Sequence, residues 1–331
     1  RASGVTPRVG ARAMPSAHTR SRADSRMGRP WRRKRYDAVV VGSGPNGLAA
    51  AITLVGAGLE TLLIEGAQTA GGGMRSDALT LPGFLHDVCS AVHPLGRASP
   101  FFARLALERE GLSWIDPPAP LAHVMTDGSA VMLERSIDAT ANALGADGGA
   151  YAALVQPFAD RFDALMRMTL GPLRVPEAPL LLARFGVLGL QSMTALARRC
   201  FAHEPARALL AGIAAHSMLP LHLPGTASFA LVLACAGHAV GWPLPHGGSQ
   251  ALANALLQRF EQRGGELVIG EPIDALASLP AASAYLFDVT PAQLLRIAGA
   301  ALPASHRRRL RRFRYGPGVF KLDWALSAPI P

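Results

Sequence analysis

The sequence VVVGSGPNGLAAAITLVGAGLETLLIEG, residues 39–66, decides the fold of this chain. Residues 38–41 form a short β-branched run that predicts a strand buried on both faces, and this run leads directly into a GxGxxG motif. A helix is predicted from Asn46 onward, and Gly56 and Gly58 end it. A second strand is predicted at residues 61–64. This order of strand, glycine turn, helix and strand is typical of a nucleotide-binding βαβ unit.

Each glycine of the motif has its own physical purpose. Gly42 permits the tight turn, Gly44 lets the backbone approach a pyrophosphate, and Gly47 lets the helix pack closely on the strand. Pro45 and Asn46 are expected to lie at the cofactor where this helix starts, because its free N–H groups and positive dipole end would face bound phosphates. The motif therefore predicts a cradle for the pyrophosphate of a dinucleotide.

An acidic residue follows the second predicted strand. Glu65 lies 23 positions after Gly42 and can accept hydrogen bonds from ribose hydroxyls. A carboxylate at this place disfavours a 2′-phosphate, so FAD or NAD fits the site and NADP does not. An ordinary glycine-rich turn is the structural alternative, but it needs neither the strand, the helix nor the acid at this spacing.

The net positive charge of the chain is concentrated in its first 35 residues. Residues 1–35 hold eleven of the 33 basic and one of the 23 acidic residues, which leaves 22 of each sign in residues 36–331. The composition therefore gives no electrostatic case for nucleic acid as a partner. Residues 1–35 are interpreted as a basic, disordered tail outside the fold, which is either a transit peptide or a non-native segment translated from upstream sequence. The expected location is cytoplasmic, with or without membrane association, or mitochondrial if the tail is a transit peptide.

Length and cysteine usage place further bounds on the chain. A chain of 331 residues with 50% hydrophobic content can bury a large core and suggests about two domains. Its three cysteines form no CxxC pair, so they predict neither a disulfide framework nor a metal site. The longest apolar stretch, residues 227–240, is too short to span a bilayer.

Two further segments carry a family resemblance. The glycine-rich run GGGMRS at residues 71–76 and the segment LTLPGFLHDVCSAVHPL at residues 79–95 resemble flavoproteins of the phytoene desaturase and amine oxidase superfamily. The second segment is similar to the phytoene dehydrogenase-related branch, which includes the pyridine nucleotide-disulphide oxidoreductase-domain group. The resemblance covers residues 36–331. It implies an FAD cofactor whose pyrophosphate lies along Gly71 and Gly72, with Arg75 as the phosphate-pairing cation and the backbone of Ile273 at the adenine.

The family pattern is incomplete in this chain. The family often has arginine where this sequence has Thr69 and Gly73, which leaves Arg75 as the expected cation. Only one GxGxxG of this kind is present and no second dinucleotide domain, so FAD would have to carry the redox chemistry itself. The expected reaction is transfer of hydride from a C–H bond of an apolar or amine substrate to flavin N5. The electron acceptor is left open among oxygen, a quinone and another carrier.

Two alternatives to an active oxidoreductase stay open. One is a nucleotide- or prenyl-binding escort protein on the same fold, which the intact glycines and Glu65 disfavour because an escort does not need a pyrophosphate cradle. The other is an inactive fragment of the enzyme, because residues 319–326 have the pattern of a strand with no partner sequence after them. A small apolar substrate and a peripheral membrane contact are the expected partners.

Three residues are candidates for a catalytic role. His86 and His93 lie in a cluster with Asp87 and Cys89 that has no recognised metal spacing, and the favoured interpretation is that both histidines are hydrogen-bonded near the flavin or the substrate entrance. Lys321 matches, on the family resemblance, a lysine that bonds a water at flavin N5 in amine oxidases. A surface lysine on a strand is the alternative for Lys321.

The predicted architecture is α/β, a Rossmann-like FAD-binding domain split by a mostly helical substrate domain. Its expected parts are residues 36–102 for the first part of the FAD-binding domain, 103–240 for the substrate domain, 241–300 for the return segment, and 301–331 for the start of a substrate-domain sheet.

Local patterns fill in these parts. A hairpin is predicted over residues 123–133, and helices over 151–168, 179–185, 187–201 and 251–262. Strands are predicted at 266–269, 285–289 and 319–326, and the arginine run at 307–314 is interpreted as the solvated end of a helix. Aliphatic and methionine-rich faces at 165–168 and 180–182 would line a lipid-sized pocket, rest on a membrane or form core.

Overall fold

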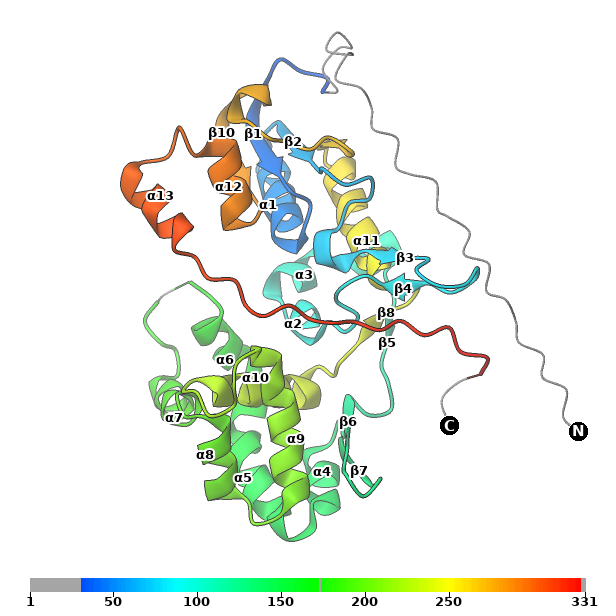
Figure 1. Ribbon diagram of the computed structural model, residues 1–331, viewed down its shortest axis with the longest axis vertical. Helices are drawn as coiled ribbons and strands as arrows, with labels where there is room; N and C mark the ends of the chain where they lie inside the picture. Colours follow the sequence, from blue (N-terminus) through cyan, green and yellow to red (C-terminus); the bar gives the residue numbers. More distant parts are fainter. Residues whose placement is uncertain (1–30, 173, 329–331) are drawn as a thin grey trace, which may run out of the picture.

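A computed structural model describes residues 31–172 and 174–328 of the chain. Figure 1 shows two lobes, one built around a parallel sheet and one built from helices, with short helices and ribbons between them. The chain enters the sheet lobe, crosses into the helical lobe and returns to the sheet lobe. This is the split nucleotide domain that the sequence predicts.

The sheet lobe contains four parallel strands in the order β10-β1-β2-β9. Its strands are β1 (Arg35–Val41), β2 (Thr61–Ile64), β9 (Glu266–Val268) and β10 (Ala281–Phe287). Helices α1 (Pro45–Gly56) and α11 (Ser249–Gln262) pack on one face, against Val40 and Leu63. Helix α12 (Pro291–Ala298) covers the other face, against Val39 and Ile64. Strands buried on both faces explain why β1 and β2 are continuous apolar runs.

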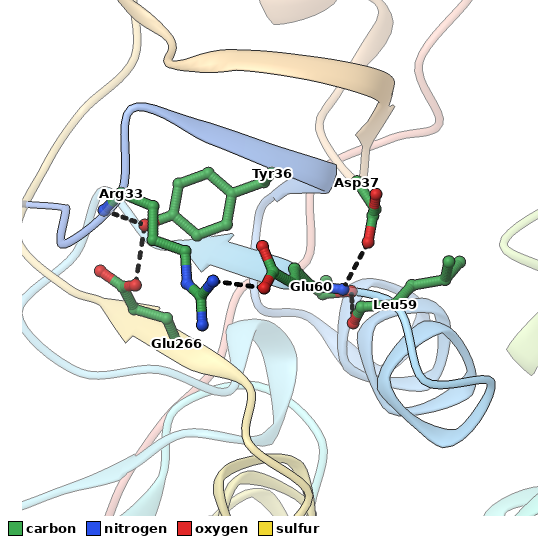
Figure 2. A network of polar contacts seen from close by, with 7 residues as sticks. Arg33, Tyr36, Asp37, Leu59, Glu60 and Glu266 are labelled. Atoms are coloured by element: carbon green, nitrogen blue, oxygen red, sulfur yellow. Dashed lines mark hydrogen bonds and ion pairs between the residues drawn. The ribbon is translucent and has the colours of Figure 1, made fainter.

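A polar network joins the amino-terminal ends of three strands (Figure 2). The Tyr36 hydroxyl accepts a hydrogen bond from Arg33 N at 3.0 Å and donates one to Glu266 at 2.7 Å. Burial, followed by the Glu266 hydrogen bond, raises the pKa of Tyr36 to about 12. Arg33 also pairs with Glu60, whose backbone N–H donates to Asp37 at 2.9 Å. These contacts fix β1, β2 and β9 at one edge of the sheet and leave the carboxyl-terminal edge free for a ligand.

Short elements lie between the two lobes (Figure 1). They are the ribbon of β3 (Ser76–Asp77) with β4 (His86–Asp87), the helices α2 (Pro94–Arg97) and α3 (Pro100–Leu105), and the ribbon of β5 (Trp114–Ile115) with β8 (Leu244–Pro245). Phe101 and Leu105 of α3 pack on the core beneath α1 and α11. The segment that contains α3 is therefore attached to the sheet lobe.

The helical lobe packs around α10 (Thr226–Ala239), the long apolar stretch of the sequence. Around it lie the hairpin of β6 (Leu121–Val124) and β7 (Ala130–Leu133) and the helices α4 (Ile137–Ala143), α5 (Gly148–Ala159), α6 (Phe162–Thr169), α7 (Pro179–Gly189), α8 (Met193–Cys200) and α9 (Glu204–Ala214). Small residues such as Ala230 and Ala234 are fully buried in α10 and let its neighbours approach closely. The Tyr151 hydroxyl and His238 Nε2 share a buried hydrogen bond at 2.6 Å.

Two predicted helix boundaries in this lobe are wrong. The single helix predicted over 151–168 is two helices, because Arg161 has non-helical dihedrals (φ −124°, ψ 34°) and separates α5 from α6. Pro157 lies inside α5 and does not end it. The break predicted at Gly186 lies later, at residues 190–192. Ser192 begins α8 there, and its Oγ accepts from Ala195 N at 3.2 Å.

The strand predicted at 319–326 is also wrong. Helix α13 (Ala304–Arg311) is present with exposed arginines, but residues 313–326 after it are extended and form no sheet. Figure 1 shows this segment crossing the region between the lobes. Phe320 is 87% exposed and Trp324 is 69% exposed. An apolar extended run becomes a strand only when a neighbouring strand accepts its hydrogen bonds, and the described residues supply none.

Within residues 31–172 and 174–328, no single helix has both the length and the apolar character needed to cross a membrane. Helices α7 and α8 meet the criterion only as a pair bent by 101°.

Candidate dinucleotide-binding site

A cavity of about 630 Å³ opens at the carboxyl-terminal ends of β1, β2 and β10. Ligands of open α/β sheets bind at this edge. The following predicted residues line the cavity: Gly42, Gly44, Pro45, Asn46, Glu65, Gly72 and Ile273. Most of the cofactor-binding residues expected from the sequence therefore meet in one place.

The glycine turn leaves no room for side chains. Gly42 has φ of 100°, and a Cβ there would lie 2.2 Å from the carbonyl oxygen of Asp288. A Cβ on Gly47 would lie 2.0 Å from the carbonyl oxygen of Gly42. The helix α1 is thus seated directly against the turn that ends β1, as the roles predicted for these two glycines require.

The second glycine loop packs on the first, backbone to backbone. Gly71 and Gly72 have φ of 124° and 57°, and a Cβ on Gly72 would lie 2.7 Å from Cα of Gly44. Gly71 N also donates a hydrogen bond to Ser43 Oγ at 3.1 Å. Gly44 and Gly72 thus lie side by side in the cavity wall, whereas Gly71 is buried behind them and does not line the cavity. That Gly71 and Gly72 lie along a pyrophosphate stays a prediction.

Glu65 is fixed by three hydrogen bonds. Its Oε2 accepts from Ser43 N at 2.9 Å and from Ser43 Oγ at 2.6 Å, and its Oε1 accepts from Ala67 N at 2.8 Å. Burial by itself raises the pKa of Glu65, but these bonds and the charge of Arg75 together hold the pKa below its usual value. A carboxylate has about four acceptor positions, so about one remains for a ribose hydroxyl.

Asp288 is a site residue that the sequence reasoning missed. It follows β10, and its Oδ2 accepts a hydrogen bond from Gly47 N at 2.8 Å. The N-cap residue Gly44 has no side chain and Pro45 has no N–H, so Asp288 supplies the cap of α1 from the end of the neighbouring strand. The only signal in the sequence was an acid at the carboxyl end of a strand, the edge where the ligand site lies.

We expect Asp288→Asn to strengthen binding of ADP, which carries the adenosine and pyrophosphate groups of a dinucleotide. The amide oxygen can still accept from Gly47 N, while one negative charge leaves the cavity, so affinity should rise roughly twofold to tenfold. Isothermal titration measures this. Asp288→Ala is the control for the cap and should lower the free energy of unfolding by about 1 kcal/mol. Weaker ADP binding by the Asn variant would mean that the carboxylate itself accepts a ligand hydroxyl.

Two arginines lie near the cavity. Arg75 Nε donates to the carbonyl oxygen of Gly72 at 3.0 Å, and its side chain does not line the cavity, so its pairing with a phosphate stays a prediction. Arg296 of α12 does line the cavity and pairs with Asp274 at 3.2 Å. The sequence pattern assigned Arg296 no role, because its place depends on how α12 packs on the sheet.

The catalytic candidates lie outside this cavity. His86 Nε2 hydrogen-bonds to Thr80 Oγ1 at 2.6 Å, and its Nδ1 lies 3.5 Å from Asp323, which also pairs with Lys321. The structure thus brings His86 and Lys321 to one carboxylate. Lys321 is not on a strand, since residues 313–326 form no sheet.

His93 lies apart from this pair. Its Nε2 and Ser249 Oγ are 2.9 Å apart, and burial lowers the pKa of His93, partly offset by Asp87. Asp87 accepts from Ser249 N at 2.7 Å and so caps α11. In the structure, His93 and Asp87 are both hydrogen-bonded to Ser249 at the start of α11, which is a structural role. No group of three metal-ligating side chains is found among the described residues.

Comparison with known proteins gives two matches in sequence. Residues 40–105 match the NAD(P)-binding Rossmann-like domain family. One subunit of the limonene dehydrogenase of Castellaniella defragrans is 29% identical over 105 residues, which are 32% of this chain and 19% of that protein. The family match falls on the predicted nucleotide unit, so the dinucleotide-binding fold expected from residues 39–66 is confirmed.

Comparison with solved structures extends over most of the chain. A putrescine oxidase in complex with putrescine superposes with a TM-score of 0.57 at 20% identity, over 84% of this chain and 63% of that one. Over the matched residues, the chain shares its fold with this amine oxidase. An oxidoreductase from Methanosarcina mazei gives a TM-score of 0.53 at 16% identity, over 83% of this chain and 65% of that one. The resemblance drawn from the sequence is confirmed at the level of this fold, and the chain spans about two thirds of the length of these structures.

Proposed function

We propose that this chain binds FAD and belongs to an oxidoreductase that removes hydride from a C–H bond of an apolar substrate. One observation carries the proposal: two glycine loops, separated in sequence, pack backbone to backbone beside a fixed, ionised Glu65 at the carboxyl edge of a parallel sheet. This arrangement fits the pyrophosphate and ribose of a dinucleotide whose ribose carries no 2′-phosphate.

The residues present fit one half of FAD in particular. Gly42, Gly44 and Gly72 leave backbone exposed to a pyrophosphate, Glu65 has a free acceptor for a ribose hydroxyl, and Ile273 lines the end of the cavity next to β9. When bound, FAD supplies the two-electron acceptor for the reaction. The amine oxidase fold and the similarity to a limonene dehydrogenase subunit both support an oxidoreductase.

The test is a titration of the purified chain with FAD, NAD and NADP. We expect FAD to bind tightly, with a shifted visible absorption spectrum. Glu65→Ala should weaken FAD by about tenfold to a hundredfold, because it removes a charge-assisted hydrogen bond from the ribose. It should create no preference for NADP, because no described cation forms an ion pair with Glu65. Arg75 donates to the carbonyl oxygen of Gly72, and Arg296 is paired with Asp274.

Glu261→Ala is the matched control, because Glu261 is exposed on α11 and makes no described side-chain contact with the cavity. Tight NADP binding by the unmodified chain would overturn the role given to Glu65. A chain that binds none of the three nucleotides but binds a prenyl chain would instead support the escort alternative.

A further inference from the structure

A second pair of cavities lies where the helical lobe meets α2 and α3. One has a volume of about 460 Å³ and is bounded by α6, α7 and α10, and the other has about 380 Å³ and is bounded by α2, α3 and α6. Leu95 and Leu170 line both. The two cavities are therefore neighbours, and we call the pair the channel, with an apolar chamber and a cationic chamber.

The apolar chamber is lined by large hydrophobic side chains that the fold leaves uncovered. Leu170 is 63% exposed and Phe229 is 43% exposed, although both line a concave surface. Exposed apolar surface of this kind marks a binding site, and the volume is that of a small-molecule pocket. The polar side chains that line this chamber are those of Thr169, His216 and Ser228.

The cationic chamber has an unbalanced charge. Arg104, Arg167 and Arg174 line it, and no described carboxylate lines either chamber. Arg167 is neutralised by Glu177, whose Oε1 accepts from it at 2.8 and 3.0 Å. Arg104 and Arg174 have no carboxylate partner among the residues that the structure describes. Two guanidinium groups thus remain available at one end of an apolar channel.

The channel adjoins the nucleotide-binding lobe. Phe101 lines the cationic chamber and also packs on the core formed by α1 and α11. Helix α2 on the same wall begins after His93, which is bonded to Ser249 at the start of α11. A molecule in the channel would therefore lie at the boundary between the two lobes, where a substrate must meet a cofactor held by the sheet lobe.

We propose that this channel binds the substrate and that the substrate is an apolar chain ending in an anionic group, a carboxylate or a phosphate. This inference rests on the proposed function. The apolar chamber takes the chain, and Arg104 and Arg174 take the anion. A cationic amine is disfavoured, because it would bring a like charge to a wall whose described residues offer no carboxylate to receive it.

The test compares four ligands that share one twelve-carbon chain: dodecanoate, dodecyl phosphate, dodecanol and dodecylamine. Each competes, below its micelle concentration, with a fluorescent dansyl-undecanoate probe on the full chain. Dodecanoate and dodecyl phosphate should displace the probe at concentrations about tenfold or more below those of dodecylamine. The stronger of the two anions identifies the head group. Stronger binding of the amine, or equal binding of all four ligands, would overturn the proposal.

Variants separate the two chambers. Arg104→Glu combined with Arg174→Glu should weaken both anions about tenfold or more and leave dodecanol unchanged. Phe229→Asp should weaken all four ligands. Arg308→Glu on α13 is the matched control, because Arg308 is exposed and lines neither chamber.

Each variant is also titrated with FAD. Anion binding without FAD binding would contradict the proposed function and leave the channel assignment standing, whereas FAD binding with no anion preference would contradict the channel assignment alone.

Discussion

Gly44→Val is expected to abolish FAD binding while the chain stays folded. The backbone of Gly44 is extended, with φ of −62° and ψ of 176°, so valine can adopt it without strain. Its Cβ, however, would lie 2.7 Å from Asp288 Oδ2, at the start of α1. The branched side chain would then stand in the space through which a pyrophosphate approaches the helix N-terminus.

Fluorescence titration with FAD measures the loss, and the far-ultraviolet circular dichroism spectrum measures the fold. Displacing the Asp288 carboxylate from Gly47 N should cost about 1–3 kcal/mol in the free energy of unfolding, which leaves the chain folded. The double variant Gly44→Val with Asp288→Ala relieves that collision. If the double variant still binds no FAD, the lost affinity comes from the blocked approach to the helix. Undiminished FAD binding by Gly44→Val would place the pyrophosphate elsewhere.

Gly47→Ala is expected to unfold the sheet lobe. The added Cβ would lie 2.0 Å from the carbonyl oxygen of Gly42 and 3.1 Å from Cβ of Asp288. The first contact is with backbone, which no rotamer change can relieve, so α1 would have to move away from β1. That movement separates Leu48 and Ile52 from the core they share with α11. We expect a loss of more than about 3 kcal/mol in the free energy of unfolding.

Urea denaturation followed by circular dichroism checks this expectation. Gly186→Ala is the matched control, because a Cβ on Gly186 meets nothing within 4 Å and alanine favours the helix that contains it. The control should keep or slightly raise the denaturation midpoint. An unchanged midpoint for Gly47→Ala would show that the turn has more room than the structure gives it.

The sequence was most informative where the chemistry is local. The strand, turn, helix and second strand at residues 38–64 could be predicted nearly residue by residue, because the glycine spacing, the apolar runs and Glu65 belong to one short stretch. Gly71 and Gly72 were placed by resemblance, and the structure brings them to Gly44.

Contacts between distant residues were not predictable in the same way. Asp288 is 241 positions from Gly47, and no local sequence pattern predicts which helix it caps. The boundary at Ser192 depends on one side-chain cap, which hydrophobic periodicity does not report. The run at 319–326 has strand-forming residues, but whether it pairs depends on neighbours outside the run.

The position of β10 beside β1 has a consequence for synthesis of the chain. These two strands exchange hydrogen bonds in register, with Val40 opposite Leu286, yet about 240 residues separate them. At typical rates of translation, β1 and β2 leave the ribosome roughly 10–50 s before β10 can complete the sheet. During that interval the β10-facing edge of β1 is unpaired, and unpaired apolar edges recruit other chains. The helices of the helical lobe all precede β10 in the chain, so they leave the ribosome before the sheet is complete. We therefore expect the sheet lobe to be the part of the protein that depends on chaperones during synthesis.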